Sequence, residues 1–176
     1  MKRKNIPFDK FTLSVIQSFN NRWMLLAAGE NKPGGFNVMT VSWGGFGVIW
    51  NKPLAMVVVR PSRFTFEFME KSDTYTLSSF SGEFKDQLTL CGTRSGRAMD
   101  KIEACGFKPV ASSAVPAPGF EEAELIIECR KMYYDDINPA HFLASHIEGN
   151  YGGRDYHRMY FGEIVAIQGS EDYLKK

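Results

Sequence analysis

The sequence predicts a mainly β fold, an antiparallel barrel into which a few short helices are inserted. Apolar segments of strand length recur between turns rich in Pro and Gly, whereas helical patterns are few and short. These strands do not alternate regularly with long helices, which disfavours a doubly wound parallel sheet. Aromatic residues make up 14% of the chain and also favour strands. A barrel is therefore the expected architecture.

The strands are predicted from apolar runs bounded by turn residues. The segment 55–59 is apolar on both faces, which favours a central position in the sheet. The Gly44-Gly45 pair is expected to make a turn or to let another group approach the backbone closely. The predicted strands cover residues 23–28, 36–43, 54–60, 74–80, 125–134 and 157–168, and the predicted turns or loops cover 32–35, 51–53, 115–119 and 151–153.

Three short helices are predicted. The first, over 63–71, opens directly after a strand. The second, over 81–90, has a candidate cap at Ser81 and apolar positions at Phe84 and Leu88. The third, over 99–105, is one or two turns long and ends at Gly106, a residue type common after helix ends.

Length and charge limit the function classes. The 176 residues are expected to form one domain over 1–176. Lys and Arg number 21 against 20 Asp and Glu, so neither a nucleic-acid nor a membrane-surface partner is expected. The basic start, 1–4, is not followed by an apolar stretch, and no apolar run approaches the length of a membrane span. Three widely spaced cysteines fit a structural role and a cytoplasmic location.

The strand that begins near Asn37 is the first candidate binding segment. Alternation would place Asn37, Met39, Val41 and Trp43 on one face, with Thr40 and Ser42 among the residues on the other. Its amide and hydroxyl groups offer the mixed donors and acceptors that a planar heterocycle needs. The alternative is a half-buried strand that ends in a glycine turn.

Two loops carry positive charge and hydroxyl groups. In 60–65 (RPSRFT), two arginines lie where a strand gives way to a predicted helix, which suits a phosphate. The alternative is surface pairing of these arginines with Glu67, Glu70 or Asp73. The second loop, 91–97 (CGTRSGR), could converge on the same anion or be an ordinary solvated loop.

The last candidate is His157, which follows a Gly-rich loop. The histidines and nearby acids lack the spacing of a dedicated metal site, so no metal is expected. Neither a serine-hydrolase elbow nor a Rossmann or Walker glycine motif is present in the sequence.

Together these segments resemble the flavin reductase-like family, and most of all its flavoredoxin-type branch. The resemblance rests on 37–45 (NVMTVSWGG), 51–53 (NKP) and 60–65, with similar stretches at 91–97 and 153–157 (GRDYH). It covers about residues 20 to 168, which leaves short extensions at both ends. It implies a Greek-key FMN-binding split barrel and a homodimer with one FMN per subunit at the interface.

The resemblance also implies roles for particular residues. The strand along the edge of the isoalloxazine would contribute Asn37, Met39, Thr40, Val41, Ser42 and Trp43. The phosphate and ribityl chain would lie near Arg60, Ser62, Arg63, Phe64 and Thr65, with Arg94 and Ser95 approaching from the second loop.

The implied activity is transfer of electrons or hydride through bound FMN, with NADH or NADPH as candidate donor and a redox protein or monooxygenase as candidate partner. Many flavin reductases carry Gly-Asp-His near the nicotinamide, but here Tyr156 stands between Asp155 and His157. Both His157 and Tyr156 are therefore candidate catalytic residues. The alternatives are a non-catalytic FMN-binding electron carrier or sensor and a pyridoxamine-phosphate-oxidase-like enzyme.

Overall fold

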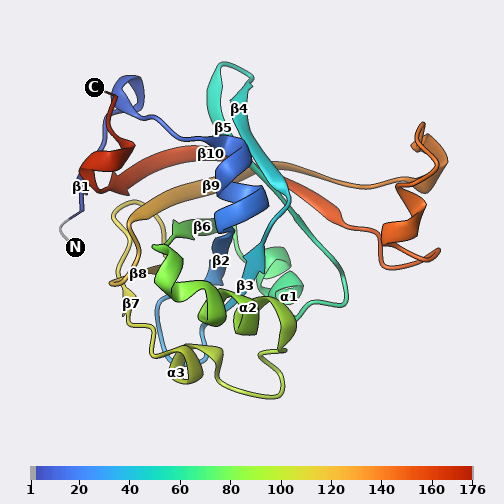
Figure 1. Cartoon of the computed structure of the whole chain (residues 1–176), viewed down its shortest axis with the longest axis horizontal. Coiled ribbons are helices and arrows are strands. Elements are labelled where there is room, and N and C mark those ends of the chain that lie inside the picture. The colour runs from blue at the N-terminus through green and yellow to red at the C-terminus, as the bar shows by residue number, and fades with distance from the viewer. Residues whose placement is uncertain (1–2, 176) are drawn as a thin grey trace.

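One curved antiparallel sheet forms the centre of the molecule (Figure 1). The computed structural model describes residues 3–175, so the first two residues of the basic start and Lys176 lie outside it. The strands follow the order β3-β2-β6-β9-β10-β5-β4, with β1 paired to β10. Their bounds are β1 (Lys4–Asn5), β2 (Met24–Gly29), β3 (Phe36–Val41), β4 (Gly44–Ile49), β5 (Lys52–Val59), β6 (Thr74–Ser79), β9 (Leu125–Asp136) and β10 (Arg158–Gly169), while β7 (Pro109–Val110) and β8 (Gly119–Phe120) form a separate pair.

The connection from β3 to β4 shows that this sheet curls into a barrel. These strands stand at opposite ends of the strand order, yet only Ser42 and Trp43 join them. Three Cα steps reach at most about 11 Å, so the two ends of the sheet must nearly meet. Within the described residues, no ladder pairs β3 with β4, and the barrel stays open there. This opening, which we call the seam, makes the fold a split barrel, as predicted.

Short helices close the barrel and cover its outside. Met69 of α1 (Phe64–Lys71) is buried in the barrel interior, while α2 (Lys85–Thr93) packs on β2 and β3 and α3 (Lys101–Cys105) packs on α2. None of the helices in the part of the chain that the structure describes is long and apolar enough to cross a membrane. The remaining helical turns are a π-helix, η2 (Gln17–Arg22), and the 3₁₀ turns η1 (Phe8–Lys10), η3 (Gly82–Phe84), η4 (Pro139–His141), η5 (Glu148–Asn150) and η6 (Glu171–Tyr173).

Two hydrophobic cores share the strand β2. Every residue of β2 is buried, because Leu26 and Ala28 face the barrel interior while Leu25 and Ala27 face the helices outside. The inner core continues through Met39, Val41, Val57, Val59, Tyr75, Ile127 and Tyr160. The outer core continues through Val38, Phe80, Leu88, Cys91, Phe107, Phe120 and Ile126. The alternation expected along β3 is thus confirmed, since Met39 and Val41 point inward and Val38 outward.

The glycines after Trp43 do not make a turn; they begin the unpredicted strand β4. A Cβ on Gly44 would lie 2.6 Å from the ring of Phe19, which belongs to the equally unpredicted π-helix. The hairpin turn comes later, at Trp50 and Asn51, which both have left-handed φ angles of 50° and 58°. Pro53 therefore lies in β5 rather than in a turn.

Other differences concern the ends and positions of elements. The α2 helix begins at Lys85, and the expected cap at Ser81 makes no side-chain capping bond; it precedes the 3₁₀ turn η3 instead. The apolar strand β5 was expected to be central, but it is second from one end of the strand order, where it pairs with β10 on one side and β4 on the other. The other predicted strands and helices are present, and their ends differ from the predicted ones by at most two residues.

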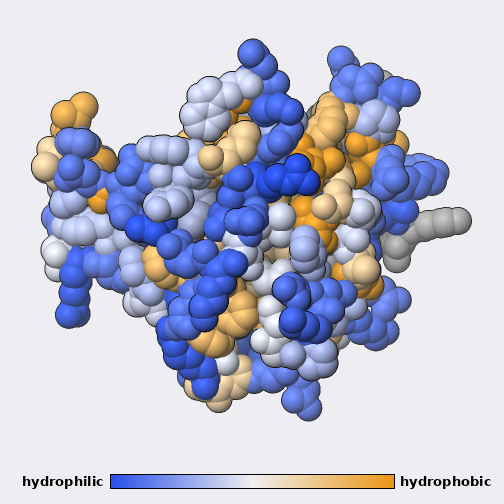
Figure 2. Space-filling view, turned by 180° about the vertical axis from the view of Figure 1, so that it is seen from behind, coloured by the Kyte–Doolittle hydropathy of each residue, from blue (hydrophilic) through white to orange (hydrophobic). Residues whose placement is uncertain are grey.

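Residues 137–157, here called the arm, connect β9 to β10 and project from the barrel (Figure 1, right). Its aromatic rings pack on one another, with the ring centroids of Tyr151 and Tyr156 4.9 Å apart and those of Phe142 and Tyr151 5.9 Å apart. Seen from behind, hydrophobic residues stand at its tip (Figure 2), and the side chain of Leu143 is fully exposed. The arm is therefore an ordered extension with an apolar end.

Candidate functional site

A groove of about 200 Å³ runs along the seam. Its floor is the end of β3 and the link to β4, and its other walls come from β5, from the loop between β5 and α1, and from His157 at the end of the arm. The lining residues are Met39, Thr40, Val41, Ser42, Trp43, Val58, Arg60, Arg63 and His157. The groove exists because the sheet does not close between β3 and β4, which leaves the outer edge of β3 without a partner strand in the described part of the chain.

A second cavity of about 200 Å³, here called the cationic hollow, adjoins this groove. Met39 and Arg63 line both, so the two spaces lie side by side. The hollow is formed by the start of α1 and the loop between α2 and α3. Its other lining residues are Ser62, Phe64, Thr65, Thr93, Arg94, Ser95, Gly96 and Lys101.

Arg63 and Lys101 bring positive charge to the hollow. Arg63 donates from Nη1 to the carbonyl oxygen of Gly92 at 2.7 Å, which fixes the guanidinium beside the second loop. The ammonium of Lys101 is buried and donates to the carbonyl oxygens of Val38 and, at 3.1 Å, Cys91. Burial lowers the pKa of Lys101. Since no carboxylate contacts either cation among the described residues, the hollow suits an anion.

The hydroxyl and remaining charged groups complete the hollow. Thr65 is buried, and its Oγ1 accepts a 2.7 Å bond from Asn37 Nδ2, so its proton stays free to donate. The guanidinium of Arg94 makes no hydrogen bond or ion pair within the described part of the chain. Asn37 does not line the hollow; its bond to Thr65 orients that hydroxyl. Asn37 lines a different cavity of about 840 Å³, to which Phe64 also contributes.

The polar groups of Ser62 and Arg60 are hydrogen-bonded to the arm. The backbone N–H and Oγ of Ser62 donate to the two carboxylate oxygens of Asp155 at 3.0 and 2.6 Å. Arg60 donates to the carbonyl oxygen of Asn150 at 2.7 Å and lies over the ring of Tyr151 at 5.0 Å. Part of the predicted phosphate corner therefore serves to hold the arm against the groove.

His157 stands in the groove as a neutral imidazole. Its Nδ1 lies 3.0 Å from the Tyr151 hydroxyl, and its ring centroid is 5.2 Å from that of Trp43. Burial, together with the charge of Arg60, lowers the pKa of His157 to about 4. With Tyr151 donating to Nδ1, the imidazole keeps its proton on Nε2, which can serve as a hydrogen-bond donor near neutral pH.

The side chain of Tyr156 does not line the groove. Its hydroxyl donates to the carboxylate of Glu148 at 2.9 Å, and its side chain lines a separate hollow with Pro61, Asp136 and Arg158. The structure therefore brings His157 to the groove and Tyr156 to the neighbouring space under the arm. Both assignments of catalytic role stay predictions.

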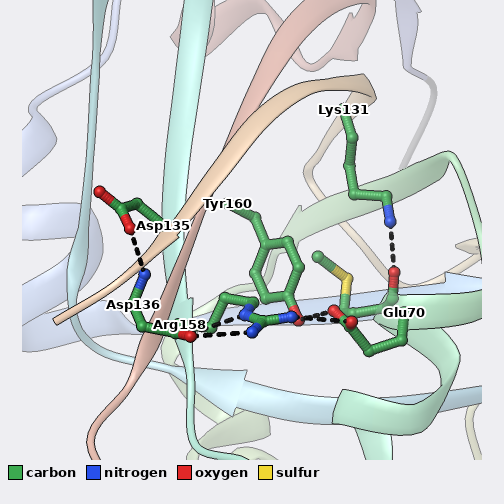
Figure 3. Close-up of polar contacts among 7 residues, drawn as sticks. Glu70, Lys131, Asp135, Asp136, Arg158 and Tyr160 are labelled. Carbon is green, nitrogen blue, oxygen red and sulfur yellow. Dashed lines mark hydrogen bonds and ion pairs between the residues drawn. The ribbon is translucent and has the colours of Figure 1, made fainter.

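A polar network fastens the base of the arm to α1 (Figure 3). Arg158 makes a bidentate pair with Asp136, both bonds being 2.8 Å, and donates to Glu70 at 2.8 Å. The Tyr160 hydroxyl donates to the same Glu70 carboxylate at 2.6 Å. Arg158 lowers the pKa of Asp136. Because Arg158 follows His157 directly, this network also fixes where the imidazole enters the groove.

Four lining residues were not among the predicted site residues: Val58, Thr93, Gly96 and Lys101. Thr93 and Gly96 do lie in the loop 91–97 that the sequence analysis singled out. The Asp100 side chain caps α3 by accepting from the N–H groups of Ile102 and Glu103. This cap was a usable signal, because it places Lys101 at the first position of α3. Nothing in the sequence shows that the ammonium turns inward to two carbonyl oxygens.

Comparisons with known proteins agree with this geometry. The model of the flavin reductase like domain matches residues 16–176. An uncharacterized protein of Archaeoglobus fulgidus is 28% identical over 109 residues, which cover 62% of this chain and 59% of that relative. The chain thus spans less than two thirds of that relative's length.

Solved structures give the same fold. The flavoredoxin of Desulfovibrio vulgaris (Miyazaki F) is similar with a TM-score of 0.66 and 19% identity, over 92% of this chain and 75% of that one. An FMN-binding protein from Thermus thermophilus, solved with bound 1-cyclohex-2-enone, is similar with a TM-score of 0.66 and 20% identity, over 91% of this chain and 79% of that one. At these identities the likeness concerns the fold.

Proposed function

Because the chain belongs to the flavin reductase-like family, we propose that it binds FMN and acts as a flavin-dependent oxidoreductase. Reducing equivalents pass from a reduced donor to an acceptor by way of the bound flavin. The observation that carries this proposal is the meeting of the seam groove and the cationic hollow at Met39 and Arg63.

The two spaces match the two halves of FMN. A phosphate requires fixed cations and hydroxyl donors, which Arg63, Thr65, Arg94, Ser95 and Lys101 supply in the hollow. A flat ring system requires a narrow slot beside backbone groups, which the end of β3 supplies at the open seam. The residues present therefore fit FMN, with the phosphate in the hollow and the ring along residues 39–43.

FMN supplies the hydride and electron chemistry when bound, and the protein supplies binding, orientation and electrostatics. Arg63 contributes positive charge where the two spaces meet. His157 contributes a neutral N–H donor at the wall of the groove. Trp43 lines the groove and is 45% exposed, so its ring can form a wall of the site and still contact a second molecule.

NADH or NADPH is the proposed donor, and a redox protein or a monooxygenase is the proposed acceptor partner. A nicotinamide needs an open face beside the flavin and a donor for its carboxamide oxygen. The arm brings His157 into the lining of the groove, which supports the proposal of a nicotinamide donor without requiring an acid–base pair.

A homodimer in the cytoplasm is part of the same proposal. The arm projects from the barrel and exposes an apolar tip with Leu143 fully accessible (Figure 2). A second copy of the chain would cover this tip and complete the open side of the groove. Sedimentation at micromolar concentration should give twice the mass of the chain, and a monomer would contradict this part. The odd number of cysteines, three in the chain, argues against a disulfide framework and supports a reducing compartment.

The experiment is a visible spectrum of the purified protein with FMN, followed by anaerobic addition of NADH or NADPH. The proposed enzyme should show a perturbed flavin spectrum that bleaches on adding one of these donors and turns over with an acceptor. A protein that binds FMN but accepts no electrons from either donor would be a carrier or sensor. Oxidation of a pyridoxamine phosphate would instead indicate the other split-barrel chemistry.

A further inference from the structure

Two cysteine sulfurs face each other behind the cationic hollow. Cys91 lies in the last turn of α2 and Cys105 ends α3, and their Sγ atoms are 3.7 Å apart. Fourteen positions separate them in the sequence, so the loop between the two helices brings them together. Cys91 is fully buried in the outer core, whereas Cys105 is partly accessible.

We propose that Cys91 and Cys105 form a reversible disulfide that responds to low-molecular-weight disulfides and alters phosphate binding in the adjoining hollow. The crosslink stands on the cysteine geometry alone, and the effect on binding rests on the proposed function. Bond formation requires the sulfurs to approach to about 2.05 Å. The short helix α3 has only five residues and can accommodate such a shift.

The reaction is thiol–disulfide exchange in two steps. The more accessible Cys105 thiolate attacks one sulfur of a small disulfide, forms a mixed disulfide and releases one thiolate. Cys91, after losing its proton, then attacks the Cys105 sulfur and releases the second small thiolate. Two protein thiols and one small disulfide thus become one protein disulfide and two small thiols. Burial raises the pKa of both cysteines, so the reaction is faster in mildly alkaline solution.

Cys129 provides the contrast within the same chain. It is fully buried in the inner core on β9, where its neighbour is Tyr75 rather than another thiol. Burial raises its pKa as well. Reactivity toward small disulfides should therefore separate the pair from the single cysteine, although all three are free thiols.

Lys101 connects the cysteine pair to the hollow. It lies four residues before Cys105 in the sequence, at the other end of α3, and its ammonium donates to the Cys91 carbonyl oxygen at 3.1 Å. A bond between the sulfurs would draw the end of α3 toward α2 and displace this ammonium relative to Arg63. We therefore expect the disulfide form to bind phosphate-bearing FMN more weakly and to bind riboflavin unchanged.

The first experiment treats the reduced protein with excess oxidised glutathione at about pH 8.5, close to the ordinary pKa of a thiol. Free thiols are then alkylated, and the peptides are analysed by mass spectrometry. A peptide pair joined through Cys91 and Cys105, lost again on adding dithiothreitol, is the expected result. Cys129→Ala should give the same pair. Cys91→Ala should stop at a glutathione adduct on Cys105. Absence of the joined pair from the wild-type protein would overturn the proposal.

The second experiment measures FMN and riboflavin affinity of the reduced and the oxidised protein. A loss of roughly threefold or more for FMN alone is expected, and by linkage FMN should oppose oxidation in a glutathione buffer by the same factor. A crosslink with unchanged FMN affinity would overturn the coupling to the hollow. If the reduced protein binds no FMN, the proposed function fails, while the peptide result still decides the crosslink.

Discussion

The cationic hollow and the arm meet at the same groove but are held in different ways. The hollow is built from the barrel and its helices, with Lys101 and Thr65 both buried and bonded within the body. The arm is held by polar contacts at its base, between Asp155 and Ser62 and between Arg158 and Glu70, while its tip is exposed. The groups of the hollow are buried in the body of the molecule, whereas the arm is joined to the body by polar and charged groups at its base.

This difference separates two tasks. A cofactor that stays bound benefits from a rigid, buried set of cations, because little is then lost in ordering them. A wall that must admit a second molecule benefits from attachment at its base alone, since local opening then costs less than unfolding the barrel. The comparison predicts that substitutions in the hollow change cofactor affinity and substitutions in the arm change kinetics or local opening.

The largest expected effect is that of Arg63→Ala. Loss of one charge-assisted contact at the junction of groove and hollow should cost about 1.5–3 kcal/mol, or roughly tenfold to more than a hundredfold in FMN affinity. Riboflavin, which lacks the phosphate, should lose much less. Fluorescence titration with both ligands measures the difference. Arg130→Ala, which removes an exposed arginine of β9, is the matched control. Equal losses for FMN and riboflavin would show that Arg63 does not bind the phosphate.

Arg158→Met tests the attachment of the arm. The substitution removes the bonds to Asp136 and Glu70 but keeps a long side chain over Tyr134. Amide hydrogen exchange within 137–157 should accelerate roughly tenfold, while FMN affinity stays within about twofold. Arg154→Met, which changes an exposed arginine of the same arm, should alter neither. Unchanged exchange in the Arg158 variant would mean that the network does not anchor the arm.

His157→Ala tests whether the histidine at the end of the arm positions the electron donor in the groove. Flavin reduction by excess NADH in a stopped flow should slow several-fold, with FMN affinity nearly unchanged. Tyr156→Phe loses only the bond to Glu148 outside the groove and should be reduced at the wild-type rate. Equal rates for all three proteins would indicate that this end of the arm does not position the donor.

The smallest effect concerns stability and pH. His157 has a folded pKa near 4 against an ordinary value of 6.5, so protons bind more readily to the unfolded chain. Its contribution is complete above about pH 6.5 and declines as the pH falls toward 4. Urea unfolding at pH 7 and pH 5 should show this loss, and His157→Gln should reduce it. Asp136, whose pKa Arg158 lowers, should lose its contribution only below its ordinary value of 3.8.

Local sequence patterns predicted the barrel strands well because the interior demands regular apolar residues. The strands predicted at 74–80 and 125–134, for example, are present as Thr74–Ser79 and Leu125–Asp136. The strand β4 was missed because Gly44, Gly45 and Gly47 are typical of turns. Their role is visible only in three dimensions, where Gly44 makes room for Phe19 at the seam.

The candidate site, too, was predictable only in part from the sequence. Residue types and spacing were sufficient to nominate Arg63, Thr65 and the end of β3, which do line the two spaces. The partners of Ser62 and Lys101 were not predictable, because Asp155 lies 93 positions from Ser62 and the Val38 carbonyl lies 63 positions from Lys101. Such long-range contacts depend on the closure of the barrel and not on the local sequence.

Pairing between the two ends of the described chain makes the molecule nearly a closed loop of polypeptide. Lys4 pairs with Gly169 on the sheet, Phe11 bridges to Leu174, and both ends lie on the side away from the arm (Figure 1). Because the segments near both ends lie on the same side of the sheet, a linker can join them, and new ends can be opened at an exposed tip such as that near Leu143. The order of segments along the gene is thus separable from the architecture, and a circularly permuted protein opened in the arm would keep the barrel and the cationic hollow intact.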